Sequence, residues 1–254
     1  MNTFISFIHR DLREGLLSWK HTLFKFLFQP FVYLFVFGYI LGKVFPIGMS
    51  NGNYSDVVAP GILAMMVMNV ALGTAGSSLV TGYYFKSMEA WLLTPITLRG
   101  FMLSRVVSGT INSAAAGIIG IILIYLVLGL SPANMIFVFV FILMGGLVFS
   151  IIGVIAFTLP KTPDKAQEVL SFILMPMMFF GCTFYTYSVL PSPWNILSLL
   201  FPTTYLSEGM RAAYNPQIPH INTGIILIGL LSGLVILFYM ADRIFERRFK
   251  DFLW

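Results

Sequence analysis

The sequence predicts an all-α membrane protein with six membrane-spanning helices. Of its 254 residues, 58% are hydrophobic and only 10% are charged, whereas soluble domains carry about 25% charged residues. Six apolar stretches approach or reach the roughly 20 residues that a helix needs to cross the hydrocarbon core. Basic residues gather beside alternate stretches, as membrane topology requires. The bilayer, rather than water, is therefore the expected solvent of this chain.

The six predicted spans follow one another without a hydrophilic linker of domain size, so residues 1–254 are expected to form a single membrane domain. The spans are residues 23–45, 57–79, 106–128, 135–159, 169–187 and 221–241. The fifth contains Pro176 and Gly181 and then becomes polar and aromatic. Proline removes a helical hydrogen bond, and neighbouring helices must satisfy the freed backbone groups. We therefore expect the outer end of this span to be kinked or unwound.

The distribution of Lys and Arg predicts the orientation of the spans. All but two of the 15 basic residues lie near or before the start of the first span, between the second and third, between the fourth and fifth, or after the sixth. The two exceptions are Lys43 and Arg211. Because positive side chains are retained on the cytoplasmic side, both termini are expected in the cytoplasm. The same pattern accounts for the net charge of +5 without nucleic-acid binding.

Residues 1–22 precede the first span and have a different character. Over residues 3–20, an α-helix would place Phe4, Ile8 and Leu12 on one face and Arg10 and Arg13 on the other. This pattern predicts a helix lying on the cytoplasmic membrane surface. The helix serves either as an anchor or as part of a docking surface for a cytoplasmic partner.

Residues 188–220 form a long external connection. Its apolar stretch 194–201 is too short to span the membrane. Prolines at its start, middle and end predict short helical pieces in a re-entrant or interfacial hairpin. Glu208 and Arg211 stand at i and i+3, close enough to pair. Since either charge alone at the bilayer centre would cost roughly 2.5–3.5 kcal/mol, the pair is expected near the outer interface.

The cytoplasmic connection 81–105 contains a second amphipathic segment, residues 83–95. Met88, Trp91 and Leu92 share one helical face at i, i+3 and i+4, and Pro95 ends the helix. The segment is either a short helix across the cytoplasmic surface that contacts a partner, or an interfacial turn in which Trp91 anchors the chain to the membrane.

Sites for catalysis or ion coupling are scarce. The three histidines and the single cysteine, Cys182, have no metal-ligand spacing, and no span holds paired acids. The closest approach to a phosphate-binding loop, residues 38–44, lacks one residue between its glycines and has no Ser or Thr after its lysine. Asn69 and Asn112 are the conspicuous polar side chains inside the spans, where interhelical hydrogen bonding or substrate contact would explain them. Neither an enzyme nor a metal site is expected, and we do not expect the driving force to be supplied within this chain.

Two motifs carry a resemblance to the type 2 ATP-binding-cassette (ABC) exporter permeases. The first resembles their coupling-helix signature and reads Met88-Glu89-x-Trp91-Leu92-Leu93-Thr94-Pro95. The second resembles their external re-entrant segment and reads Leu190-Pro191-x-Pro193-Trp194, then Phe201-Pro202-x-Thr204-Tyr205-Leu206 and Glu208-Gly209-x-Arg211. Length, span count and the amphipathic N-terminus agree with the same family. The sequence looks most like its drug, polysaccharide and nodulation-factor exporters.

This resemblance implies the permease subunit of an ATP-driven exporter in the cell inner membrane. Two permeases, expected to be a homodimer, would surround a central pathway above two ABC ATPase subunits. ATP and Mg would be held by those ATPases, so this chain would carry no cofactor. The resemblance assigns ATPase coupling to Lys86, Met88, Glu89, Trp91, Leu92 and Pro95.

The same resemblance places the pathway on the second and fifth spans. The residues it assigns there are Met65, Met68, Asn69, Met175, Met178, Phe179 and Phe180, and those in the external segment are Trp194, Tyr205, Glu208 and Arg211. A lining of Met and Phe suits an amphiphilic, lipid-like or glycan cargo. Two alternatives stay open: a secondary carrier that needs no ATPase, and a membrane-anchored assembly subunit that transports nothing.

Overall fold

A computed structural model describes residues 5–6, 8–10, 28, 30–44, 53–84, 97–160 and 163–253. All regular structure in these ranges is helical. Much of the predicted surface helix, including Arg13, lies outside them, although Arg10 is described. The residues assigned to ATPase coupling also lie outside the described ranges: Lys86, Met88, Glu89, Trp91, Leu92 and Pro95.

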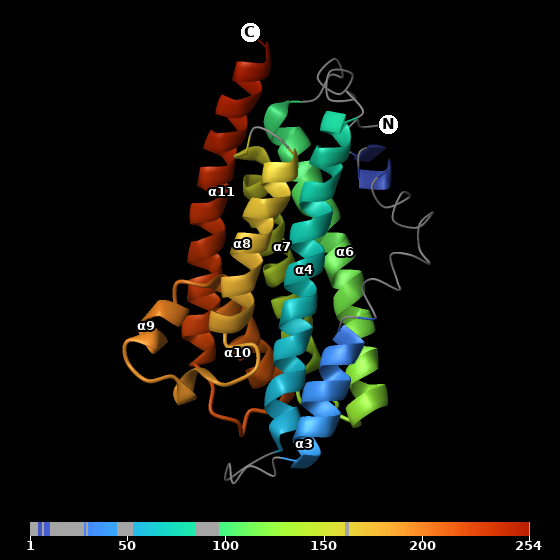
Figure 1. Ribbon diagram of the computed structural model, residues 1–254, viewed down its shortest axis with the longest axis vertical. Helices are drawn as coiled ribbons and strands as arrows, with labels where there is room; N and C mark the ends of the chain where they lie inside the picture. Colours follow the sequence, from blue (N-terminus) through green and yellow to red (C-terminus); the bar gives the residue numbers. More distant parts are fainter. Residues whose placement is uncertain are drawn as a thin grey trace.

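Four described helices are long and apolar enough to cross a membrane. They are α4 (Tyr54–Tyr84), α6 (Leu98–Leu128), α7 (Met135–Thr158) and α11 (Thr223–Leu253). These helices correspond to the second, third, fourth and sixth predicted spans. Figure 1 shows them running side by side, with the N-terminal ends of α4, α7 and α11 at the same end as the C-terminal end of α6.

The other two predicted spans are only partly represented. The described part of the first is a short apolar helix, Pro30–Lys43, which includes the π-helix η1 (Leu34–Ile40) and continues into α3 (Leu41–Val44). The fifth corresponds to α8 (Pro163–Phe180), which has 18 residues. Because α8 ends at Phe180, before the predicted end of the span, the expected loss of helix in the last part of this span is confirmed.

Capping residues explain where the long helices begin and end. The Thr97 side chain accepts a hydrogen bond from the Gly100 N–H at the start of α6, and the Asn134 side chain accepts one from the Phe137 N–H at the start of α7. Gly129 ends α6 with φ of 70°, a left-handed conformation that glycine adopts without strain. α6 therefore begins eight residues before the predicted span, and Arg99 and Arg105 belong to this helix rather than to a connection.

α4 lies at the centre of the bundle. Of its apolar window, 83% is buried, against 17% for α11. One core cluster packs α4 against α7 and α10 (Pro202–Tyr214), with Met65, Phe141 and Leu206 among its buried members. α4 is thus surrounded by protein, whereas α11 presents most of its length to the outside.

α4 and α7 can approach closely because Gly153 of α7 has no side chain. A Cβ atom added to Gly153 of α7 would lie 2.6 Å from the backbone oxygen of Leu72 in α4. Small residues let helices in membranes approach closely and gain van der Waals contact. Gly73 of α4, in contrast, has open space around the position of a Cβ atom.

Gly153→Ala should therefore lower the thermal unfolding midpoint of the purified protein, because backbone atoms cannot move aside as a flexible side chain can. Overpacking of this kind costs about 1–3 kcal/mol. Gly73→Ala is the matched control, and it should leave the midpoint unchanged or raise it slightly, since alanine favours helix. Equal midpoints for the two variants would contradict the close α4–α7 contact.

Candidate functional site

The segment predicted to be external, residues 188–220, which we continue to call the external segment, folds into short helices of two kinds. η2 (Tyr187–Val189) and α9 (Trp194–Ser198) are short and largely exposed, and α10 is longer and largely buried. Pro202 begins α10, where its fixed φ suits a first helical residue. Figure 1 shows α9 standing outside the bundle. The segment therefore consists of an outer part and an inner helix that reaches into the protein core.

Glu208 and Arg211 form an ion pair inside α10. Arg211 Nη1 lies 2.7 Å from Glu208 Oε1, and both side chains are fully buried. The predicted pairing is confirmed. The pair is enclosed by protein, which the sequence did not predict, and its expected place near the outer membrane interface stays a prediction. The insertion cost of a lone charge does not apply here, since each charge has several partners in other parts of the fold.

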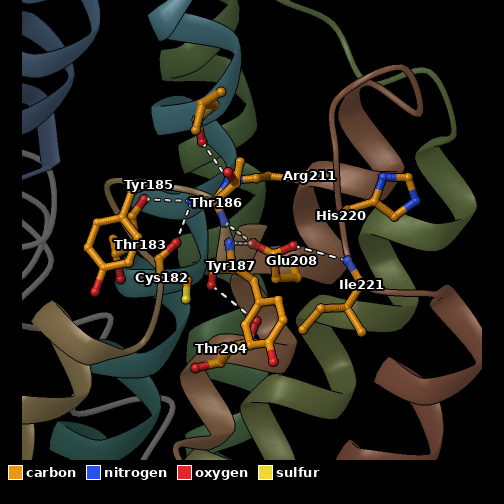
Figure 2. Close-up of polar contacts among 12 residues, drawn as sticks. Cys182, Thr183, Tyr185, Thr186, Tyr187, Thr204, Glu208, Arg211, His220 and Ile221 are labelled. Atoms are coloured by element: carbon orange, nitrogen blue, oxygen red, sulfur yellow. Dashed lines mark hydrogen bonds and ion pairs between the residues drawn. The ribbon is translucent and has the colours of Figure 1, made fainter. Parts of the chain in front are cut away.

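Arg211 binds two separate parts of the chain through its other donors. Nε donates to the Val57 carbonyl in the first turn of α4 at 2.9 Å. Nη2 donates to the Thr183 carbonyl at 2.9 Å and to the Cys182 carbonyl. Cys182 has a left-handed backbone with φ of 53°, just after α8 ends. Figure 2 shows the two successive carbonyls directed at the guanidinium.

Glu208 accepts hydrogen bonds from two further segments. Its Oε1 accepts from the Tyr187 N–H at 2.9 Å, and its Oε2 accepts from the Ile221 N–H at 3.1 Å. The carboxylate thereby holds the start of η2 and the chain just before α11. Burial lowers the pKa of Arg211, an effect that the nearby Glu208 charge opposes. Guanidinium titrates so far above neutrality that Arg211 stays charged.

Two side-chain hydrogen bonds also hold α10 against α9 and against the chain that follows α8. Ser207 Oγ donates to the Gly181 carbonyl at 2.6 Å, and Thr204 Oγ1 donates to the Ser198 carbonyl at 2.6 Å. Gly61 of α4 leaves the space that the Thr183 carbonyl occupies, so any larger residue there would push the chain after α8 away from α4. We refer to Glu208, Arg211 and their partners as the buried network.

Most of the chain, including most of the buried network, matches a known protein family. The model of the ABC-2 type transporter family matches residues 3–215, which include the first predicted spans and the buried network up to Arg211. The chain belongs to the ABC-2 type transporter family. Curated relatives include the inner membrane transport permease YadH of Escherichia coli strain K12 and that of Shigella flexneri. Each is 25% identical over 236 residues, which cover 92% of this chain and 88% of the relative.

The residues predicted to line the pathway of this permease fall in two different environments. Met65 and Met68 of α4 are fully buried, and Asn69 is partly buried. On α8, Met175 and Phe179 are 66% and 50% exposed. Met178 and Phe180 are partly buried. Asn112, instead of bonding between helices, donates to the Ser108 carbonyl of its own helix.

Aromatic side chains gather where α8 meets the external segment. The Phe180 ring stacks on Trp194 with centroids 5.9 Å apart and on Phe201 at 6.1 Å. Trp194 is half exposed, whereas Tyr205 is partly buried and packs against Gly229 of α11. Of the four residues assigned to the external segment, Trp194 therefore lies at the surface, and Glu208 and Arg211 lie deepest.

Two parts of the polar architecture were not predicted from the sequence: the backbone partners of the buried network and the ion pairs between α6 and α11. The network partners Val57, Cys182, Thr183, Tyr187 and Ile221 act through backbone groups, so their side chains give no signal. At the other end of the bundle, Arg99 of α6 lies 2.9 Å from Asp242 and 3.9 Å from Glu246 of α11. A signal for this second link was present, because the two acids lie one turn apart on the same helix.

Loss of one partner of the buried pair should strongly destabilise the permease. Glu208→Ala leaves a buried guanidinium without its counterion, which costs about 3–5 kcal/mol. Thermal unfolding of detergent-purified protein measures the effect. The control is Arg99→Ala, which breaks an exposed ion pair worth about 0–1 kcal/mol. Similar unfolding midpoints for the two variants would contradict the assigned role of the network.

Cys182 offers a second measurement, because it is a single cysteine that is fully buried beside Arg211. N-ethylmaleimide should label it slowly in the native protein. Arg211→Lys should speed labelling about tenfold or more, because a single ammonium group cannot hold Val57, Thr183 and Glu208 together and local opening becomes easier. Arg99→Lys is the control. Unchanged labelling in Arg211→Lys would show that the guanidinium does not hold this segment closed.

Proposed function

We propose that this chain is the membrane subunit of an ATP-driven exporter whose ATPase is a separate protein. The observation that carries the proposal is the family match over residues 3–215. The chain also has no phosphate-binding loop of its own, which agrees with an external source of energy. The relatives' name, inner membrane transport permease, supports a place in the inner membrane.

The proposed contact with the ATPase is the connection between α4 and α6, with Glu89 as the polar contact and Trp91 and Leu92 as the apolar anchor. α4 ends at Tyr84 and α6 begins at Leu98, so the connection joins two long helices directly. The two helices pack against each other within the bundle. A displacement of the connection would therefore move both as packed rigid elements.

The buried network supports transmission of this movement to the far end of the bundle. Arg211 ties the N-terminal turn of α4 to the chain that follows α8. In the proposed mechanism, a tilt of α4 driven from its cytoplasmic end therefore carries the outer end of α8 with it. The second and fifth predicted spans would move together, and the pathway would open at the outer side.

The proposed cargo is amphiphilic, lipid-like or a glycan, and the proposed assembly holds two permeases and two ATPases. Exposed apolar side chains of α8 support a place for this helix at the pathway: Phe172, Met175 and Phe179 are each at least half exposed and recur at i, i+3 and i+7. Met65 and Met68 of α4 are covered by neighbouring helices in this conformation. α8 is thus the better supported of the two predicted linings.

The double variant Glu89→Ala, Trp91→Ala tests the coupling directly. It should lower copurification of the cognate ATPase, and transport-coupled ATP hydrolysis, by about tenfold or more, because a buried Trp and a charged contact are typical binding hot spots. The permease should still insert in the membrane. The control is Lys43→Ala, an exposed cation in the apolar helix before α4. Normal export by the double variant would contradict the proposed coupling helix.

The rival classes give different outcomes in the same cells. Export by a secondary carrier would stop when the ion gradient collapses and would continue without the ATPase. An assembly subunit would show no export under either condition. Stimulation of ATP hydrolysis by a panel of amphiphiles and lipid-linked sugars would then identify the cargo class.

A further inference from the structure

The C-terminal end of α11 carries three chemically different faces. Ala241 and Phe245 are fully buried against α6 and α7 and form the apolar face. Asp242 and Glu246 form an acidic face that lies against Arg99 of α6. The third face is basic and contains Arg243 and Arg247, which are both exposed. The apolar and acidic faces contact other helices of the protein, whereas the basic face is open to a binding partner.

The basic face continues the outward stripe of α11. At 100° per residue, Arg243 and Arg247 fall within about 120° of arc together with Ile228, Val235 and Tyr239. These three side chains are 69%, 65% and 60% exposed. The proposed pathway is assigned to α8 and not to α11, so we take the exposed apolar side chains of α11 to face lipid. The two arginines then lie on the lipid side of α11 and point away from the bundle.

The depth of the two arginines also matches that of lipid headgroups. A helix needs about 20 residues to cross the hydrocarbon core, and α11 begins at Thr223. Arg243 then lies at the far edge of the hydrocarbon, and Arg247 lies one turn beyond it. Arg243 Nη2 donates to the Tyr239 hydroxyl at 3.0 Å, and its guanidinium lies 5.3 Å from the centre of that ring. Tyrosine and arginine in this arrangement are typical of the membrane interface.

The neighbouring acids do not cancel this positive charge. Asp242 is held by Arg99 at 2.9 Å, and Glu246 lies 3.9 Å from the same guanidinium. The acidic face is thus engaged within the protein, while the two arginines face outward. An anion that approaches from the lipid side meets two guanidinium groups one turn apart.

We propose that Arg243 and Arg247 bind the phosphate of an anionic phospholipid at the membrane surface around the C-terminal end of α11. Guanidinium matches phosphate geometry and can donate two hydrogen bonds at once. Lipid is the favoured occupant over an acidic protein, because both arginines extend a stripe that is apolar up to Tyr239. A protein partner would have to approach through the headgroup layer.

Native mass spectrometry of the full chain in detergent, with added phosphatidylglycerol or phosphatidylcholine, tests the proposal. The native protein should retain phosphatidylglycerol preferentially. Arg243→Gln with Arg247→Gln should lower its retention about tenfold or more, since each basic residue near an anionic membrane surface contributes about fivefold. Arg243→Lys with Arg247→Lys, which keeps the charge, should retain most of the lipid.

Lys43→Gln is the matched control. Lys43 donates to the Tyr39 hydroxyl at 2.8 Å and lies over that ring, so it copies the Tyr239–Arg243 pair in a different helix. This variant should retain phosphatidylglycerol like the native protein. Equal loss in Lys43→Gln, or full retention by the double glutamine variant, would overturn the proposal. If the double glutamine variant keeps its phosphatidylglycerol but no longer copurifies with the ATPase, the proposal is overturned in favour of a protein partner. In phosphatidylcholine, each variant should have the same thermal unfolding midpoint as the native protein, which shows that the variant is folded.

Discussion

A guanidinium held entirely out of water is the constraint on which one end of this permease depends, namely the end at which α4 begins. Arg211 can be buried only if its nitrogens find acceptors, and each of the three donates, to the Glu208 carboxylate or to the carbonyls of Val57, Cys182 and Thr183. Those acceptors lie on α4, on α10 and in the chain that follows α8. The charge therefore fixes three elements at one point, and Glu208 adds the chain that leads into α11.

The two ends of the bundle differ in what it costs to separate their helices. At the end that holds Arg211, separation would leave a buried charge without its partner, which costs about 3–5 kcal/mol. At the other end, α6 and α11 are joined by the Arg99–Asp242 pair, whose arginine is largely exposed and whose contribution is about 0–1 kcal/mol. Apolar packing of Ala241 and Phe245 against α6 and α7 also holds the second end, so the two ends differ in kind: a buried charge at one and mainly apolar packing at the other.

Much of this architecture was predictable from the sequence, and the exceptions have physical reasons. Hydropathy found the four long helices, and for α7 the predicted end lay within one residue of Thr158. It misplaced the start of α6, because Arg99 and Arg105 were counted as a loop although helix continues through them. The spacing of Glu208 and Arg211 predicted their pairing. Their burial was not predictable, since the groups that satisfy them are backbone atoms far away in the sequence, which no side-chain pattern reveals.

The separations along the chain within the buried network have a consequence for biosynthesis. Val57 lies 154 positions before Arg211, and Ile221 lies 13 positions after Glu208. During synthesis, Arg211 cannot complete its hydrogen bonds until the earlier helices are in place, and Glu208 cannot complete its own until Ile221 has emerged. α10 must therefore settle late, when α4, α7 and the end of α8 already surround it. In a chain whose earlier helices were misplaced, Glu208 and Arg211 would lack these backbone partners. The complete network can therefore form only in a correctly assembled bundle.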